Sequence, residues 1–338
     1  MGELDRGGEA HVIAVWAGFV VFVLGVLALD LGVFHRRDHR PSTREALIFA
    51  AATAVIALAF ALLIIPAYDN HWQGLGLRPE AIGGRLNDGR AAAVKFLTGY
   101  VVELSLSMDN VFVIALIFGH LRVPAKFQHR VLFWGILGAL AMRGAMIGGG
   151  TALIAEYHWV TYVFGAFLVA TAAKMLLVKE NTASMEERWI VRWLNRHFRV
   201  TREFQEQHFV IVRDGKRWLT PLAVALVLVE TTDLLFAVDS IPAIFAITTD
   251  PFLVFTSNVF AIICLRSLYF GLANLIERFR FLSVSLAVIL GVVGLKMLLP
   301  QFVDAWLGPS QNIVMLAFVV ATLAAGAMIS VAAERRSR

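Results

Sequence analysis

Charged residues are scarce in this chain. They make up 16% of its 338 residues, whereas soluble proteins contain about 25%. Hydrophobic residues make up 59%, against about 45–50% in a soluble domain, and the mean hydropathy is +0.72. This composition excludes an ordinary soluble fold. It predicts an all-α, polytopic membrane protein whose outer surface contacts acyl chains.

Cysteines and hydrolytic motifs are also lacking. The single cysteine, Cys264, cannot form a disulfide within the chain, so it does not indicate a redox compartment. The sequence contains neither a Walker motif nor an HExxH motif, so it shows none of the usual signatures of an ATP-driven pump or a zinc hydrolase. We therefore predict a protein that is not an enzyme and that holds no tightly bound cofactor.

Nine apolar segments are long enough to span a bilayer, which takes roughly 20 residues. The segments are 11–34, 45–66, 93–118, 128–150, 158–178, 219–246, 252–273, 281–299 and 311–332. The first is too long for the core of a signal peptide and lacks a small-residue cleavage site, so we expect a retained helix. Residues 1–338 are predicted to form a single transmembrane domain.

Basic residues predict the orientation of the spans, because Lys and Arg favour cytoplasmic loops. With the N-terminus outside, the cytoplasmic loops and the C-terminal tail hold 20 of the 30 basic residues. The prediction is a multi-pass protein of the inner or plasma membrane with the C-terminus in the cytoplasm. This distribution also accounts for the net charge of +5, so we expect no nucleic-acid binding.

The loop at 179–218 has structure of its own. In the segment 184–199, the apolar residues fall at helical spacing on one face and the arginines lie off it: Trp189, Ile190, Trp193, Leu194 and Phe198 against Arg188, Arg192 and Arg196. The pattern is typical of a helix on the anionic inner leaflet, and a cytoplasmic helix packed on its own protein is the alternative. The sequence "FVIVRDGKRWL" predicts two short strands around an Asp214–Gly215 turn.

An internal repeat joins the third span to the sixth. The sequence "VVELSLSMDNVFVIALIF" at 101–118 aligns with "TTDLLFAVDSIPAIFAIT" at 231–248, and "KMLL" closes each unit. The equivalent pairs are Glu103 and Asp233, Asp109 and Asp239, Asn110 and Ser240, and Arg143 and Arg266. Because each unit has three spans, residues 93–178 and 219–299 are predicted to form an inverted repeat, the architecture of secondary transporters. The helices 11–34, 45–66 and 311–332 lie outside it.

Carboxylates within the spans predict a cation site. They are Asp30, Glu103, Asp109, Glu230, Asp233 and Asp239. Six unpaired charges would cost roughly 15–20 kcal/mol, so something must neutralise them. Arg143 and Arg266 can supply two positive charges, which leaves room for a divalent cation and protons. The alternative is a set of structural ion pairs in a bundle that transports nothing.

The candidate metal ligands are hard oxygen donors. They are Glu103, Asp109, Asn110, Glu230, Asp233, Asp239, Ser240 and Asp30, with Arg143 and Arg266 as charge-compensating residues. Such donors suit Mg²⁺, Ca²⁺ or Mn²⁺. Asp109 and Asp239 point away from their neighbours on a regular helix, so we expect local unwinding. Because Pro242 has no N–H for the carbonyl of Val238, that carbonyl is a further candidate ligand.

The two acidic motifs, with "DLGVF" at the end of the first span, resemble the TerC/Alx family of integral membrane proteins over about residues 12–333. The resemblance implies export of Mn²⁺ from the cytoplasm, with Glu103, Asp109, Glu230, Asp233 and Asp239 as ligands. It also associates the chain, by name, with tellurium resistance. The residues themselves indicate only a hard divalent cation and an inverted-repeat transporter.

Three functional hypotheses follow. The first is Mn²⁺ export by alternating access, with proton exchange as a candidate for the coupling and Ca²⁺ or Mg²⁺ as other cargoes. The second is a non-transporting scaffold in a tellurite-resistance or membrane-protein-insertion complex that docks through 179–218. The third, an intramembrane carboxylate protease, fits poorly because the acids are too many. The oligomeric state is not indicated.

Overall fold

The computed structural model describes residues 14–28, 43–82, 84–177, 189, 192–194, 196–201, 204–205, 208–213, 215–272 and 282–337. These residues form an all-α protein, as predicted, with one small two-stranded sheet. The predicted hairpin is confirmed: β1 (Val210–Arg213) pairs antiparallel with β2 (Lys216–Leu219). Gly215 adopts a φ of 70°, the left-handed conformation that a tight hairpin turn requires of one of its residues.

Long apolar helices account for most of the described chain. They are the helix Ala14–Ala28, α2 (Thr43–Asp69), α3 (Gly89–His120), α4 (Ala125–Glu156), α5 (Trp159–Leu177), α7 (Pro221–Phe245), α8 (Pro251–Leu272), α9 (Leu282–Leu298) and α11 (Gln311–Ser337). Among the described residues, six helices are long and apolar enough to cross a membrane, or seven if the bent pair of α9 and α10 (Pro300–Leu307) is one span. Nine crossings remain a prediction.

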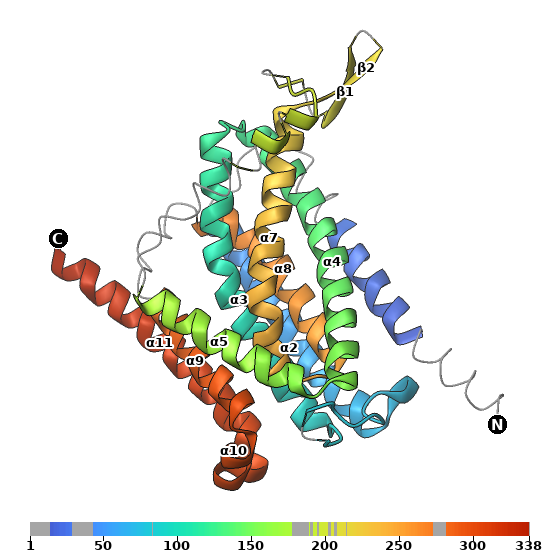
Figure 1. The fold of residues 1–338 in the computed structure, drawn as a ribbon, viewed down its shortest axis with the longest axis vertical. Helices are drawn as coiled ribbons and strands as arrows, with labels where there is room; N and C mark the ends of the chain where they lie inside the picture. Colours follow the sequence, from blue (N-terminus) through green and yellow to red (C-terminus); the bar gives the residue numbers. More distant parts are fainter. Residues whose placement is uncertain are drawn as a thin grey trace.

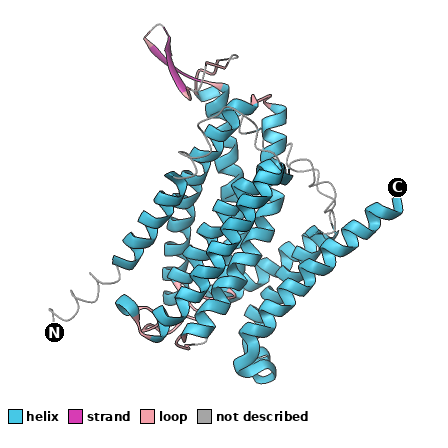
Figure 2. Cartoon of the chain, turned by 180° about the vertical axis from the view of Figure 1, so that it is seen from behind, coloured by secondary structure: helices cyan, strands magenta, loops and turns pink. Residues whose placement is uncertain are grey.

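The helices form two groups (Figures 1 and 2). The helix Ala14–Ala28, α2, α3, α4, α7 and α8 form an upright bundle, in which α3 packs against α8 and α4 packs against α7. The helices α5, α9 and α11 lie together at a slant beside it (Figure 1). Two glycines let α5 and α9 cross closely: a Cβ atom on Gly165 would lie 3.1 Å from the Gly294 carbonyl oxygen, a spacing typical of membrane helix contacts.

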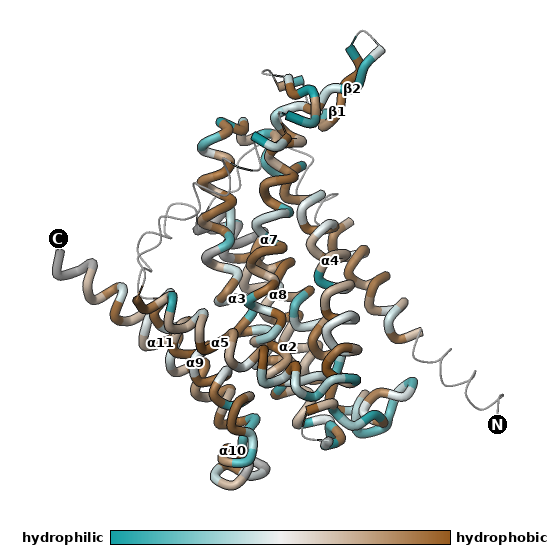
Figure 3. The backbone as a smooth tube through the Cα atoms, viewed as in Figure 1, coloured by the Kyte–Doolittle hydropathy of each residue, from teal (hydrophilic) through white to brown (hydrophobic). Residues whose placement is uncertain are grey.

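The two ends of the upright bundle differ. At one end, the hairpin of β1 and β2 precedes α7, and we call this the hairpin end. At the other, residues 70–88 connect α2 to α3 and residues 246–250 connect α7 to α8; we call this the loop end. Hydrophilic residues gather at both ends, while the helices between them are mainly hydrophobic (Figure 3). The pattern suits a protein whose middle lies in lipid.

Two sequence-based expectations about local structure need revision. The predicted unwinding is wrong: α3 is α-helical from Gly89 to His120, and α7 is α-helical from Pro221 to Phe245 with Pro242 inside it. The backbone therefore unwinds neither at Asp109 nor at Asp239. A proline costs the helix one hydrogen bond, and packing of the buried last turn can hold the helix together despite that loss. For the segment 184–199, Leu194 is buried in the protein, which supports packing of this segment on its own protein, while Trp189 and Trp193 are 66% and 44% exposed; contact with the inner leaflet stays a prediction.

Candidate cation site

A buried arginine lies at the centre of the upright bundle. Arg143, near the middle of α4, is only 2% exposed. Burying a guanidinium costs several kcal/mol unless charged and polar partners surround it. Its partners come from three other helices, α3, α7 and α8, so a single side chain joins the consecutive pair α3 and α4 to the distant pair α7 and α8.

Two carboxylates hold this arginine. Asp233 of α7 is 7% exposed and forms a bidentate contact with Arg143. Its Oδ2 accepts a hydrogen bond from Arg143 Nε at 3.3 Å, and its Oδ1 accepts one from Nη2 at 3.2 Å. Glu103 of α3 is fully buried and forms an ion pair with Nη1 through Oε1. With all three groups ionised, the trio carries one net negative charge. Glu103 and Asp233 are also the equivalent residues of the two aligned sequence units.

Polar side chains complete the first contacts around the trio. Asn110 of α3 donates from Nδ2 to Asp233 Oδ1 at 2.9 Å, and Ser107 donates to Glu103 Oε1 at 3.2 Å. Asn258 of α8 accepts from Arg143 Nη1 at 2.7 Å. Asn258 was missed by the sequence analysis, because one asparagine in an apolar run carries no spacing pattern. We call Glu103, Asn110, Arg143, Asp233 and Asn258 the central cluster.

Several oxygens of this region lack a hydrogen-bond donor. Within the described part of the chain, no donor reaches Glu103 Oε2, Asn110 Oδ1, Glu230 Oε2 or Ser240 Oγ, although all four atoms are buried. Buried polar atoms are satisfied in the large majority of cases, so each exception needs an explanation. Carboxylate, amide and hydroxyl oxygens are the donors that hard divalent cations take. The oxygens without a hydrogen-bond donor could therefore serve as ligands of a cation.

Glu230 lies one turn before Asp233 and packs against a glycine. A Cβ atom on Gly138 of α4 would clash directly with the Glu230 carboxyl group. Any residue other than glycine at 138 would push this carboxyl group away. The absence of a side chain at Gly138 therefore makes the space in which Glu230 sits beside the central cluster.

The other predicted site residues are not joined to the central cluster by any contact that the structure describes. Ser240 is 2% exposed, Asp239 is half-buried, and the side chain of Val238 is 45% exposed. Asp30 and the side chains of Asp109 and Arg266 lie outside the described residues. Among the side chains that are described, no three acids, histidines or cysteines converge as a closed metal cage. The cluster instead offers two carboxylates, two amides and a cationic side chain.

A small cavity adjoins the central cluster on the side of the hairpin end. It has a volume of about 40 Å³, and Asn110 and Asp233 form its polar wall. Its other lining residues, such as Ile114, Leu132 and Tyr269, lie toward the hairpin end of their helices. Since a water molecule takes about 30 Å³ in the liquid, the cavity has room for about one water molecule or for a small ion with little of its hydration.

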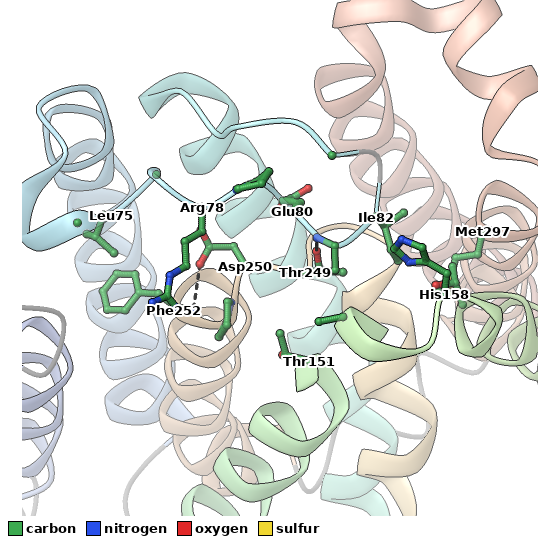
Figure 4. Close-up of a pocket in the computed structure, with 18 of the residues that line it drawn as sticks. Leu75, Arg78, Glu80, Ile82, Thr151, His158, Thr249, Asp250, Phe252 and Met297 are labelled. Atoms are coloured by element: carbon green, nitrogen blue, oxygen red, sulfur yellow. Dashed lines mark hydrogen bonds between the residues drawn. The ribbon is translucent and has the colours of Figure 1, made fainter. Parts of the chain in front are cut away.

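A much larger cavity opens at the loop end. It measures about 960 Å³ and lies among residues 73–84, the end of α4, the start of α5 and residues 249–252. Figure 4 shows Arg78, Glu80 and Asp250 toward one side of this cavity and His158 and Met297 toward the other. The central cluster thus has a narrow cavity on its hairpin side and a wide one at the loop end.

A second ionic cluster lies at the loop end. Glu80 accepts from Lys95 Nζ at 2.7 Å, from Asn87 at 3.1 Å and from the hydroxyl group of Thr248. Asp250 accepts from the Tyr68 hydroxyl group at 2.8 Å. We call Tyr68, Glu80, Asn87, Lys95, Thr248 and Asp250 the loop-end cluster. Burial raises the pKa of the Asp250 carboxyl group, and hydrogen bonds from Tyr68 and two backbone N–H groups oppose the rise.

Comparison with known proteins identifies the family of this chain. Residues 88–338 match the model of the "Integral membrane protein TerC family". A Myxococcus xanthus protein called an uncharacterized membrane protein is 47% identical over 86% of this chain and 84% of its own length. An Escherichia coli K12 protein named "Putative membrane-bound redox modulator Alx" is 43% identical over 90% of this chain and 93% of its own. No solved structure matches. The chain therefore belongs to the TerC family of multi-pass integral membrane proteins.

Proposed function

We propose that this protein exports a divalent cation, Mn²⁺, from the cytoplasm by alternating access. The observation that carries the proposal is the incomplete satisfaction of the central cluster. Two carboxylates are buried at mid-bundle, and one oxygen of Glu103 and one of Asn110 have no donor among the described residues. A purely structural ion pair would be expected to satisfy its oxygens, because unpaired ones cost about 1–3 kcal/mol each.

In this proposal, Arg143 takes the place of the ion in the empty protein. Its guanidinium group offsets one of the two negative charges of Glu103 and Asp233, which lowers the cost of the empty site in lipid. An arriving divalent cation displaces the guanidinium group from the carboxylates and adds two positive charges, so the net charge of the trio and the ion becomes +1. Protonation of a carboxylate would reverse the exchange, so proton coupling is part of the proposal.

The helix packing supports an inverted repeat. If α3, α4 and α5 correspond to α7, α8 and α9, the contact of α3 with α8 should be matched by one of α4 with α7. Both contacts are extensive, and α5 also packs extensively on its counterpart α9. Substrate sites of inverted-repeat transporters lie where the two repeats meet, which is where Glu103 and Asp233 lie.

The two cavities lie on the proposed path of the cation through the protein. In this proposal the hairpin end faces the cytoplasm, as the distribution of basic residues predicts, and the cavity of about 40 Å³ is the last part of the inward path. The loop-end cavity, about 960 Å³, is the outward vestibule. Between them the central cluster is closed, as one state of an alternating-access cycle requires.

The names of the Alx relatives refer to redox modulation. In this chain the 338 residues hold one cysteine, Cys264, which is buried and free. A dithiol couple cannot form from one cysteine. None of the described contacts favours a redox role or a scaffold role over cation export, so export remains the proposal.

The test is uptake of Mn²⁺ into inverted membrane vesicles. We expect Asp233→Asn to lower the uptake at least 100-fold, because the substitution removes a charge that must face the cation. Glu156→Gln removes an exposed acid at the end of α4 and serves as the matched control with unchanged uptake. Normal uptake by the Asp233 variant would refute the proposed site.

A further inference from the structure

Arg143 has one hydrogen-bond acceptor that stays available when a cation binds its two carboxylates. Its Nη1 donates to Asn258 Oδ1 at 2.7 Å as well as to Glu103. Asn258 is 1% exposed and comes from α8, on which neither of the two acids lies. It is neutral, so it attracts a divalent cation less strongly than the two carboxylates do. These features suit a resting place for a guanidinium group that a cation has displaced.

The orientation of this amide is fixed by its own helix. Asn258 Nδ2 donates to the carbonyl oxygen of Val254 at 2.9 Å. The opposite orientation would set the NH₂ group against the guanidinium N–H and the amide oxygen against a carbonyl oxygen, both repulsive. The oxygen of Asn258 therefore faces Arg143 whether or not the carboxylates are occupied.

We propose that Asn258 is a positioning residue for ion exchange, which holds the Arg143 guanidinium group while a divalent cation occupies Glu103 and Asp233. This inference rests on the proposed function. In the empty protein, loss of Asn258 leaves Arg143 with two carboxylates. In the loaded protein, the same loss leaves a buried guanidinium group short of its acceptor. The loss therefore destabilises the cation-bound state more than the empty state, and the affinity for the cation falls.

Mn²⁺ titration of the purified protein tests this inference. We expect Asn258→Ala to raise the Kd for Mn²⁺ about tenfold, the usual scale for a lost hydrogen bond to a charged group. Asn258→Ser guards against misfolding, because a serine hydroxyl can still bond to the Val254 carbonyl, as Ser257 does at 3.1 Å. It is too short to reach Arg143, so its Kd should rise equally.

Two further variants separate positioning from structural support. Asn258→Asp keeps an acceptor for Arg143, so its Kd should not exceed that of the unsubstituted protein. Ser257→Ala removes a neighbouring hydroxyl group whose described hydrogen bond is to its own helix, and its Kd should not change. In an Arg143→Gln background, Asn258→Ala should no longer affect the Kd, because the two residues act through each other.

The outcomes distinguish the two proposals. If the unsubstituted protein binds no Mn²⁺, the proposed function fails and this inference fails with it. If it binds Mn²⁺ and the Ala and Ser variants bind equally well, only the role of Asn258 is overturned. The same conclusion follows if the Asp variant is as impaired as the Ala variant, or if the Ala effect persists without Arg143.

Discussion

The central cluster and the loop-end cluster are both buried and ionic, yet they differ in how completely their oxygens are paired. In the loop-end cluster, every carboxylate oxygen of Glu80 and Asp250 accepts at least one hydrogen bond. In the central cluster, Glu103 Oε2 and Asn110 Oδ1 accept none from the described residues. The difference teaches that burial of charge alone does not mark a transport site.

The two clusters also differ in what they join. The loop-end cluster fastens the connection of residues 246–250 to other elements: Glu80 to Thr248, the Ala81 N–H group to Thr249 at 2.9 Å, and Tyr68 to Asp250. This arrangement ties the connections of the loop end together. The central cluster joins the middles of four helices, where a change of partner would alter how the helices pack. We therefore propose a stabilising role for the first cluster and ion exchange for the second.

The largest effect on stability is expected from Lys95→Met. The substitution leaves the Glu80 carboxylate, which lies at the loop end beside the 7% exposed Lys95, without its counter-charge. Breaking a buried pair in this way costs about 3–5 kcal/mol, which thermal unfolding in detergent would register as a lower Tm. The Kd for Mn²⁺ of the folded variant should stay unchanged.

The matched control removes both charges of that pair. Lys95→Met combined with Glu80→Gln leaves no buried ion unpaired, so much of the lost Tm should return. A double variant as unstable as the single one would show that the pairing of charges is not what holds the loop end.

An intermediate effect is expected at Gly138. In Gly138→Ala the new methyl group meets the Glu230 carboxyl group, which must move at a cost of about 1–3 kcal/mol. Vesicle uptake of Mn²⁺ should fall about tenfold if Glu230 serves the ion. The control is Gly148→Ala on the same helix, where a Cβ atom meets nothing within 4 Å. Equal uptake by both variants would remove Glu230 from the site.

The smallest effect is expected at the narrow cavity. Tyr269, which lines it, donates its hydroxyl group to Gln128 Oε1 at 3.2 Å and meets the ring of Phe118 edge-on. Tyr269→Phe keeps the ring and loses that hydrogen bond, worth about 0.5–1.5 kcal/mol. If the bond helps to close the cytoplasmic side, the uptake rate should change a few-fold with an unchanged Kd. A large change in Kd would instead place Tyr269 among the ligands.

Much of the fold was predictable from sequence, because lipid imposes a simple rule on chain segments. Each of the nine predicted apolar segments overlaps a helix of the described residues, and six or seven of these helices are long and apolar enough to cross a membrane. The sequence around Asp214–Gly215 also predicted the hairpin of β1 and β2. The unwinding at Asp239 was wrong, because a helix wheel shows where side chains point but not whether packing keeps the helix intact.

The sites were predictable only in part. Charge in an apolar run singled out Glu103, Asp233 and Arg143, and the repeat paired the two acids. Asn258 carried no such signal, because its role depends on a contact with Arg143 115 positions away. The loop-end cluster was missed for a similar reason: Glu80 meets Thr248 168 positions away, and no local pattern encodes that approach.

The most direct test of the account compares Mn²⁺ binding by two variants, each of which neutralises one buried glutamate. Glu103→Gln alters the central cluster, and Glu80→Gln alters the loop-end cluster. The account predicts that purified Glu103→Gln protein loses Mn²⁺ binding while Glu80→Gln protein retains it. Binding that survives in the first variant, or that disappears only in the second, would contradict it.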